Sequence, residues 1–342
     1  MEKFNFIKEN GQEAEPKKEV SITLPINPRH YNKLGFYGIF AYLNSTANTN
    51  MSQDIIMLNT RDGGNEENKL ELIKKIELLG IKPKNIIEDN NIEDGVSKKV
   101  FERLLNKGII RVSEEQISRC KCGKMQFKAE AKLYRTSTSL LSQDGTAKCC
   151  GSTLETKVEK VVVTSAIKRP SKLPEFYPKT VQKEIDWFYE NTNHELLLSR
   201  ETEQKYSVEI DNNKYFIDPD NLMYFYLLYL DELGYKVKEL VSGISTVKQV
   251  AYMLSFCEMA EVDLPNKISF LPRIDFKGSD NEYIEKYLEK FGNRKILNAL
   301  LWATSGSKQT VNMSEDFIKR SSGENVDNPH LYENRQKLIP QG

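Results

Sequence analysis

EVSITLPINPRHYNKLGFYGIFAYLN (residues 19–44) is the stretch that decides the fold of this chain. Its first part, EVSITLP (19–25), alternates in polarity and carries β-branched residues, which predicts a strand. A proline-containing turn separates that strand from FYGIFAYLN (36–44), where apolar residues recur at helical spacing. DIIMLN (54–59) follows as a short apolar run, which is typical of a strand buried on both faces.

Two further helices are predicted downstream of this unit. The apolar face of KLELIKKIELLG (69–80) is expected to consist of Leu70, Ile73, Ile76 and Leu79. Gly80 stands where a C-terminal cap is expected, and VFERLLNKG (100–108) repeats the pattern. This alternation of strands and helices predicts right-handed βαβ units on a doubly wound parallel sheet, with strands 19–25 and 54–59 as parallel neighbours.

The middle of the chain has a different character. Residues 110–170 contain cysteines, lysines and short β-rich stretches such as VEKVVVTSAI (158–167), and we interpret them as an inserted subdomain. After the insertion, MYFYLLYLDEL (223–233) is predicted to be another buried strand and KQVAYMLSFCEMA (248–260) a helix. Helical periodicity then runs over residues 282–301.

Composition excludes several classes of protein. The 342 residues are 39% hydrophobic, which is enough for one large domain or two modest ones, and no run of about eighteen apolar residues predicts a membrane span. Lys plus Arg and Asp plus Glu both total 49, so a basic excess for nucleic acid is lacking, although a local patch would suffice. The charged N-terminus has no signal-peptide pattern, and five cysteines argue against a disulfide framework. A cytoplasmic protein is expected.

Four cysteines form two tight pairs with metal-ligand character: Cys120, Cys122, Cys149 and Cys150. The pairs are separated by 26 residues, and Gly123 and Gly151 follow them, where glycine lets backbone amides turn towards sulfur. Thiolates in tetrahedral sets of four suit zinc, so these cysteines predict one structural zinc ion. The alternative is that they are ordinary reduced thiols. Cys257 lies on an apolar helix and is expected in the core.

The order of these parts resembles the catalytic half of glutamyl-tRNA synthetases, which are class I aminoacyl-tRNA synthetases. In size it is closer to the short paralogues that lack the anticodon-binding half. In LPINPRHYNKLGFYGIFAYLN (24–44), Lys33-Leu34-Gly35-Phe36 stands where the family has its HIGH motif. VFERLLNKGIIRVSEEQISRCKCG (100–123) leads into a C-x-C pair, as the family's helix leads into its zinc knuckle. MYFYLLYLDELGYKVKELVSG (223–243) is similar to the family's strand with two terminal acidic residues and its following "ITHVIRG" strand.

The resemblance covers roughly residues 19–320 and implies a nucleotide site. Lys33 would keep a cation at the HIGH position and Gly35 the close backbone approach, whereas Phe36 offers no hydrogen-bond donor. Lys277 stands for the family's lysine-rich signature loop, and Gly243 takes the place of the glycine in VIRG. The implied catalytic residues are therefore Lys33 and Lys277, and the implied nucleotide-binding residues are Lys33, Gly35, Phe36 and Gly243.

The resemblance also implies an amino-acid pocket, made by Tyr224, Asp231 and Ser242. Tyr224 falls where the family has a substrate-contacting tyrosine, and Asp231 with Glu232 takes the acidic pair. Ser242 stands where the family has an arginine for the glutamate side chain, and SITLP (21–25) lacks the other one. Without these arginines, glutamate is expected to bind poorly.

Together these observations predict an α/β fold: a Rossmann-like, HUP-type nucleotide-binding domain with an inserted zinc-knuckle subdomain and a C-terminal helical segment. The predicted divisions are a mobile arm at 1–18, the first half of the catalytic domain at 19–109, the zinc-knuckle insertion at 110–170, the second half at 171–275, a helical connective segment at 276–320 and a polar tail at 321–342.

Two classes of function follow from the resemblance. The first is an ATP-dependent amino-acid ligase, with magnesium accompanying ATP and with tRNA or a carrier protein as the acceptor. The second is a catalytically inactive paralogue that binds RNA or regulates a protein partner, as the eroded motifs favour. Each singled-out residue also has a structural interpretation: Lys33 and Lys277 as solvated lysines, Tyr224 as a packing residue.

Overall fold

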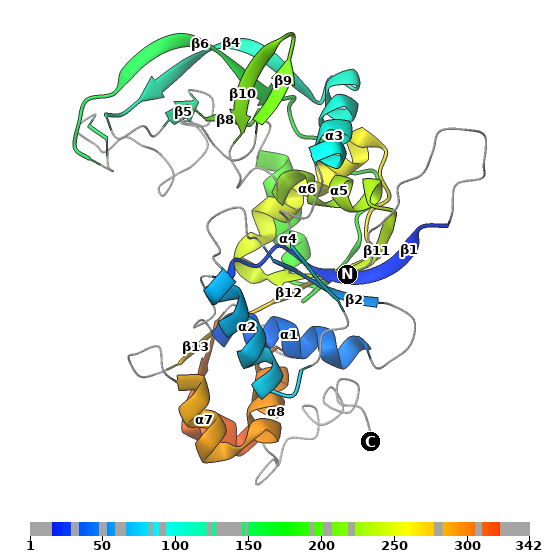
Figure 1. Cartoon of the computed structure of the whole chain (residues 1–342), viewed down its shortest axis with the longest axis vertical. Coiled ribbons are helices and arrows are strands. Elements are labelled where there is room, and N and C mark those ends of the chain that lie inside the picture. The colour runs from blue at the N-terminus through cyan, green and yellow to red at the C-terminus, as the bar shows by residue number, and fades with distance from the viewer. Residues whose placement is uncertain are drawn as a thin grey trace.

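The structure is a computed structural model of the chain (Figure 1). It describes residues 16–28, 34–47, 53–58, 66–81, 85–88, 94–121, 125–127, 146–147, 150–191, 195–200, 207–217, 223–276, 283–304 and 310–321. Among these residues, none of the helices combines the length and the apolar character needed to cross a bilayer.

A six-stranded sheet in the order β3-β2-β1-β11-β12-β7 forms the centre of the fold, and its neighbouring strands are all parallel. The strands are β1 (Lys18–Thr23), β2 (Gln53–Leu58), β3 (Asn85–Glu88), β7 (Glu175–Tyr177), β11 (Tyr235–Gly243) and β12 (Lys267–Leu271). β1 and β2 pair in parallel, with Val20 opposite Gln53 and Ile22 opposite Ile55, so the predicted pairing is confirmed.

Helices cover both faces of this sheet. One face carries α1 (Leu34–Ala47) and α2 (Glu66–Leu78); α8 (Asn293–Thr304) packs against α1, and α7 (Tyr283–Phe291) and α9 (Glu315–Ser321) pack against α8. The other face carries α3 (Asp94–Asn106), α4 (Val181–Asn191), α5 (Tyr226–Glu232) and α6 (Val247–Ala260). Two apolar cores therefore lie on opposite faces of the sheet. Consecutive residues of β11 point into them in turn: Leu240 packs in the core with α6, and Val241 packs in the core with α1. The predicted parallel α/β architecture is therefore confirmed.

The segment 223–233 was predicted to be a strand, and this prediction is wrong. Met223–Phe225 form a 3-10 turn and Tyr226–Glu232 form helix α5, followed by strand β11. All residues from Tyr226 to Leu230 are buried. A helix that is buried all round lacks a polar face, so periodicity alone does not distinguish it from a buried strand.

Helix α2 is present as predicted, but its buried face is rotated. Leu72, Ile76 and Leu79 are buried, whereas the predicted core residue Leu70 is 58% exposed. Gly80 has a φ of +76° directly after the helix, which confirms its predicted role as a cap.

Antiparallel strands form a separate part of the molecule at one end of its long axis (Figure 1). One sheet contains β4 (Ile110–Arg119), β5 (Met125–Phe127) and β6 (Glu155–Thr164), and a second contains β8 (Ser199–Arg200), β9 (Ser207–Ile210) and β10 (Asn213–Ile217). Ile110 and Val162, at the base of the long β4–β6 ribbon, belong to the main core. Because Leu198 donates a backbone hydrogen bond to Val162, a segment beyond residue 170 joins this part, and the domain division there stays a prediction.

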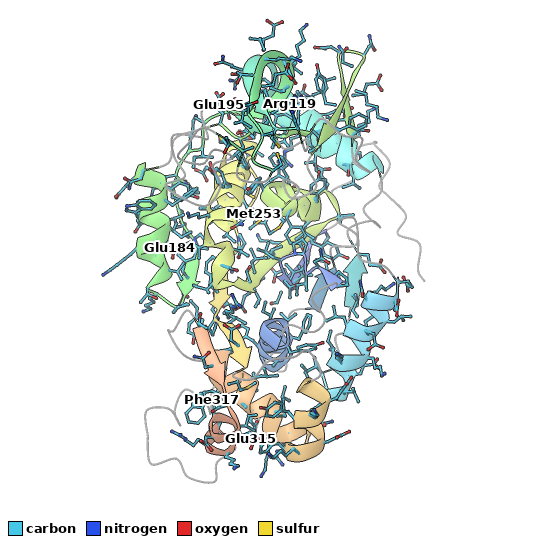
Figure 2. The ribbon with its side chains drawn as sticks, turned by 90° about the vertical axis from the view of Figure 1, so that its left-hand side faces the viewer. Arg119, Glu184, Glu195, Met253, Glu315 and Phe317 are labelled. Carbon is cyan, nitrogen blue, oxygen red and sulfur yellow. The ribbon has the colours of Figure 1, made fainter. Side chains whose placement is uncertain are left out.

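The C-terminal elements lie at the opposite end of the molecule. Strands β13 (Arg273–Phe276) and β14 (Thr310–Met313) pair in parallel beside α7, α8 and α9. In Figure 2, Glu315 and Phe317 of α9 mark this end, and Arg119 and Glu195 mark the antiparallel end. The predicted arm at 1–18 and tail at 321–342 fall largely outside the described residues.

Candidate functional site

The sheet has one topological switch point, between β1 and β11. From β1 the chain passes to α1 on one face, and from β11 it passes to α6 on the other face. Leu24 donates its backbone N–H to the carbonyl of Val241 at 3.0 Å, so the two strands stay together to their carboxyl ends. In open α/β sheets the crevice outside such a point is where ligands bind.

A tight polar turn closes the carboxyl end of β11. The hydroxyl of Thr246 donates to the carbonyl of Gly243 at 2.8 Å and lies 2.6 Å from the hydroxyl of Ser242. Because the Thr246 hydroxyl donates its one proton to the Gly243 carbonyl, the Ser242 hydroxyl must be the donor to Thr246. Ser242 is 2% exposed, and its donor is satisfied within the turn.

Gly243 occupies this turn without a structural need for glycine. Its φ of −82° and ψ of 147° are open to any residue. A Cβ built on Gly243 would meet only the Ser245 hydroxyl, at 3.8 Å. The absent side chain therefore leaves open space beside the 3-10 turn Ile244–Thr246, which begins without a side-chain cap and leads directly into α6. Free amides at a helix N-terminus favour anions such as phosphate.

Tyr224 lies at the same end of the sheet. The hydroxyl of Tyr226, two residues later, donates to the carbonyl of Thr23 at the end of β1, at 3.0 Å. The ring of Tyr224 packs against Tyr252 of α6, with centroids 5.1 Å apart. The structure thus brings Tyr224, Ser242 and Gly243 to one edge of the sheet.

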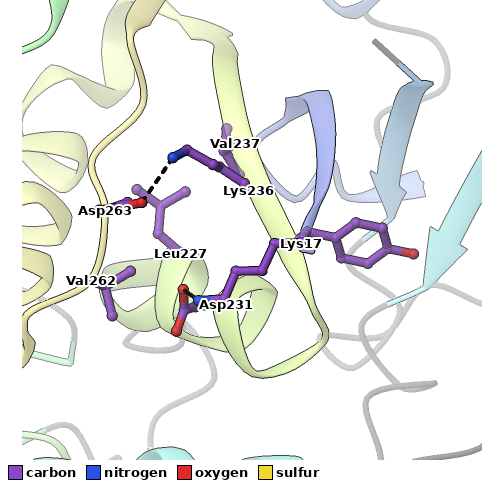
Figure 3. A pocket seen from close by; sticks show the side chains of 8 residues that line it. Lys17, Leu227, Asp231, Lys236, Val237, Val262 and Asp263 are labelled. Carbon is purple, nitrogen blue, oxygen red and sulfur yellow. Dashed lines mark hydrogen bonds and ion pairs between the residues drawn. The ribbon is translucent and has the colours of Figure 1, made fainter. Parts of the chain in front are cut away.

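Asp231 lies at the opposite edge. It forms ion pairs with Lys17, just before β1, at 2.5 Å and with Arg103 at 3.3 Å. Figure 3 shows Lys17 and Asp231 beside a hollow that also includes Lys236, the second residue of β11. The nine-residue β11 separates this hollow from Gly243 by roughly 26 Å. The hollow measures about 10 Å³, which is room for one water molecule at most.

The remaining predicted nucleotide residues are only partly described. The backbone of Gly35 and Phe36 forms the first turn of α1, which follows β1 and so begins at the switch-point edge. Lys33 and Lys277 lie outside the described residues.

Two of the four predicted zinc ligands are described. Cys120 is buried at the end of β4, and Cys150 is exposed in a turn that closes through Gly151, whose φ is +66°. Ser152 joins the two turns: its hydroxyl accepts the Lys121 backbone N–H at 3.3 Å and lies 3.0 Å from the Cys150 sulfur. Cys122 and Cys149 lie outside the described residues, and within those residues no group of three or more metal-ligating side chains occurs.

Thr246 and Tyr252 were not predicted from the sequence. A Ser or Thr just before a helix is a recognisable start signal, and Thr246 directly precedes α6. The contact between Tyr252 and Tyr224 has no local signal, because 27 residues, including strand β11, lie between them.

Comparisons with known proteins give a fold but no family. No protein-family model matches the sequence, and no curated protein sequence matches it. The chain is similar to methionyl-tRNA synthetase of Mycobacterium tuberculosis in complex with methionyl-adenylate. That match has 15% identity and a TM-score of 0.60, and it covers 91% of this chain and 69% of the other. A second structure of the same enzyme, bound by methionyl-adenylate, gives 14% identity, a TM-score of 0.61 and coverages of 92% and 69%. The chain thus has the catalytic fold of class I aminoacyl-tRNA synthetases, and this likeness does not single out the glutamyl type.

Proposed function

We propose that the chain is a class I aminoacyl-tRNA synthetase-like, ATP-dependent amino-acid ligase with its cleft at the carboxyl ends of β1 and β11. The observation that carries the proposal is the open space at Gly243, where a glycine without a structural reason precedes the 3-10 turn Ile244–Thr246, which has no side-chain cap and leads into α6. The synthetase fold of the chain supports the same interpretation.

The chemistry would be adenylation followed by transfer. A carboxylate oxygen of the amino acid bonds to the α-phosphorus of ATP, and the bond to pyrophosphate breaks. The acceptor, a group on tRNA or on a carrier protein, then displaces AMP. Magnesium would accompany ATP as a counter-ion for its phosphates. The contribution of the protein is positioning and charge stabilisation, from the α6 amides and from Lys33 and Lys277 as proposed cations.

The amino acid is proposed to be neutral rather than glutamate. A buried carboxylate side chain requires a cationic partner such as arginine. At the carboxyl end of β11, Ser242 stands in place of an arginine and its hydroxyl is already bonded to Thr246. Tyr224 and Tyr252 add aromatic surface at the same edge. Asp231 does not belong to the proposed amino-acid pocket, because its ion pairs with Lys17 and Arg103 hold it at the opposite edge of the sheet.

Amino-acid-dependent exchange of pyrophosphate into ATP, run with each standard amino acid, tests the activity. We expect exchange with at least one neutral amino acid and none with glutamate. In Gly243→Val, the added side chain should fill the cleft and abolish ATP binding measured by calorimetry, while the melting temperature stays unchanged. Unchanged ATP binding by a folded Gly243→Val protein contradicts this site.

The alternative is an inactive paralogue that binds RNA or a protein partner. It is favoured by Lys33-Leu34-Gly35-Phe36, which lacks both histidines of the HIGH motif. Absence of exchange with every amino acid, together with tRNA binding in a filter assay, would establish this alternative over the ligase.

A structural zinc ion is a further part of the proposal. Ser152 links the Cys120 turn to the Cys150 turn, and thiolates on two adjoining turns suit tetrahedral zinc. Metal analysis of chelator-washed protein should give about one equivalent of zinc. The quadruple change of Cys120, Cys122, Cys149 and Cys150 to serine should remove it, and zinc retained by that variant would refute the site.

A further inference from the structure

A polar cluster lies between helix α1 and the sheet, away from the residues discussed above. It consists of Tyr42 of α1, Glu239 of β11, and Lys267 and Ser269 of β12. One oxygen of Glu239 accepts from Ser269 at 2.6 Å, from Lys267 at 3.0 Å and from Tyr42 at 3.1 Å. Lys267 also donates to the Tyr42 hydroxyl at 3.0 Å. The cluster therefore ties one helix to two adjacent strands.

A bulge in β11 aims Glu239 into this cluster. Val20 of β1 pairs with Val237, but the next residue, Ser21, pairs with Glu239, so Lys238 is an extra residue. Side chains alternate between the faces of a strand, and one inserted residue reverses that alternation. In a regular strand Lys238 would pair with Ser21, and Glu239 would then share the face of Val237, which packs in the apolar core of α5 and α6.

Both titratable donors keep their protons at neutral pH. Burial raises the pKa of the Tyr42 hydroxyl, and the Glu239 carboxylate raises it further. Burial by itself would lower the pKa of the Lys267 ammonium, but Tyr42 and Glu239 hold that pKa above its ordinary value. Tyr42 is thus a neutral donor and Lys267 a charged one.

Helix α1 also makes apolar contacts, which are non-directional. Its described side chains, among them Tyr37, Phe40 and Leu43, pack in one hydrophobic cluster with α8 and with Ile274 of β13. Such packing stabilises the helix and holds it close to β13 and α8, and hydrogen bonds add a preferred direction that apolar contacts lack. A buried ion pair usually adds little net stability over apolar residues of similar size. The cluster is therefore better suited to fixing the position of α1 than to increasing the free energy of unfolding.

The positions of Gly35 and Gly243 relative to the cluster show which part of α1 the hydrogen bond at Tyr42 would position. α1 returns antiparallel to β1 and β11, so its first turn and the end of β11 lie in the same direction from the cluster. Gly35 precedes Tyr42 by seven residues, about 10 Å along a helix. Gly243 follows Glu239 by four residues, about 13 Å along a strand. The two distances nearly match, so the hydrogen bond at Tyr42 brings Gly35 level with Gly243.

We propose that Tyr42 is a positioning residue, whose hydroxyl fixes the axial position of α1 against β11 and β12 and thereby sets the first turn of α1 opposite Gly243. The consequence for a ligand rests on the proposed function, because it assumes that a nucleotide lies between these two elements.

The variant Tyr42→Phe tests the proposal, because it keeps the ring and removes only the hydroxyl, which donates to Glu239, accepts from Lys267 and lies 3.0 Å from the Ser269 hydroxyl. Glu239 retains Ser269 and Lys267, so no acceptor of the cluster loses all its partners. We expect amide exchange in α1 to accelerate about fivefold, the equivalent of one hydrogen bond, and exchange in β11 to stay unchanged. The KM for ATP should rise by a similar factor while the KM for the amino acid stays within about twofold.

Tyr189→Phe is the matched control. It removes a tyrosine hydroxyl that donates to the carbonyl of Ala251 at 2.6 Å and links α4 to α6 rather than α1. This variant should leave amide exchange in α1 unchanged. In addition, Glu239→Gln retains an acceptor for Tyr42 and Ser269 and should disturb α1 less than Glu239→Leu.

The results separate this inference from the proposed function. Unchanged exchange in α1 of Tyr42→Phe, or equal acceleration in Tyr189→Phe, overturns the positioning role whether or not ATP binds. Accelerated exchange confined to α1, in a protein that binds no ATP, supports the positioning role and refutes the ligase.

Discussion

Gly38 and Gly243 differ in why a glycine stands there: Gly38 allows close packing of α1, whereas Gly243 leaves open space at the end of β11. A Cβ on Gly38 of α1 would lie 2.7 Å from the Ile274 side chain and 3.2 Å from Thr304, so the helix sits directly on β13 and α8 there. Ile274 is buried and has little room to move. A Cβ on Gly243 meets nothing closer than 3.8 Å. Gly38 is thus required by the fold, whereas Gly243 is not.

The same substitution at both glycines should therefore have opposite effects. We expect Gly38→Val to lower the free energy of unfolding by about 2 kcal/mol through overpacking, which outweighs the few tenths gained in helix propensity. Gly243→Val should change that free energy by less than about 0.5 kcal/mol. Urea denaturation measures both. Equal losses would mean that Gly243 also has a packing role.

At the scale of elements, Arg103 joins the ends of three helices. From the last turn of α3, its guanidinium donates twice to the carbonyl of Ala260 at the end of α6, at 2.8 and 3.1 Å. It also pairs with Asp231 and Glu232 at the end of α5. A cation at the C-terminus of α6 complements the helix dipole and satisfies a terminal carbonyl.

Removing the Arg103 guanidinium should weaken the contacts of α3 with α5 and α6. We expect Arg103→Met to lower the free energy of unfolding by about 2 kcal/mol, because a carbonyl and two carboxylates lose a charged donor. Lys98→Met is the control on the same helix: Lys98 is exposed, and its 3.9 Å pair with Glu102 contributes under about 0.5 kcal/mol. Chemical denaturation of both variants checks the difference, and similar losses would contradict the role of Arg103.

At the scale of the whole molecule, one parallel sheet separates two apolar cores, and the Tyr42 cluster lies on the α1 side of it. The unfolded chain releases the Tyr42 proton near its ordinary pKa of 10.0, whereas the folded protein holds it to higher pH. Lys267 behaves in the same way. Their contribution to stability is thus fully present below about pH 10 and is lost as pH rises through the folded-state pKa values.

Alkaline unfolding should therefore depend on Tyr42. Between pH 9 and 11, we expect the melting temperature of the wild-type protein to fall more steeply than that of Tyr42→Phe, which lacks this proton. Tyr177 and Tyr235 also have raised pKa values and are present in both proteins, so the difference reports the Tyr42 proton together with the shifts that Tyr42 imposes on the pKa values of Lys267 and Tyr177. Thermal scans across this range make the measurement. Parallel pH profiles would show that the Tyr42 proton is not linked to folding.

Local patterns in the sequence determined the order of the elements. Alternation and β-branched residues predicted β1, an apolar run predicted β2, and helical spacing predicted α1, α2 and α6. The parallel pairing of β1 with β2 followed, because short helical crossovers leave few other topologies. These features depend on residues close together in the chain, so the sequence displays them directly.

Only the tertiary structure decided which residues meet. It made Tyr226–Glu232, within the segment predicted as a strand, a largely buried helix, placed Asp231 at the far edge of the sheet and turned Ser242 towards Thr246. It also joined Tyr42 to Glu239 across 197 residues, through a bulge at Lys238 that the sequence shows only as two adjacent polar residues between Val237 and Leu240. Such contacts arise because burial is satisfied by the whole molecule: each face is set by its distant partners, and periodicity along the chain holds no record of them.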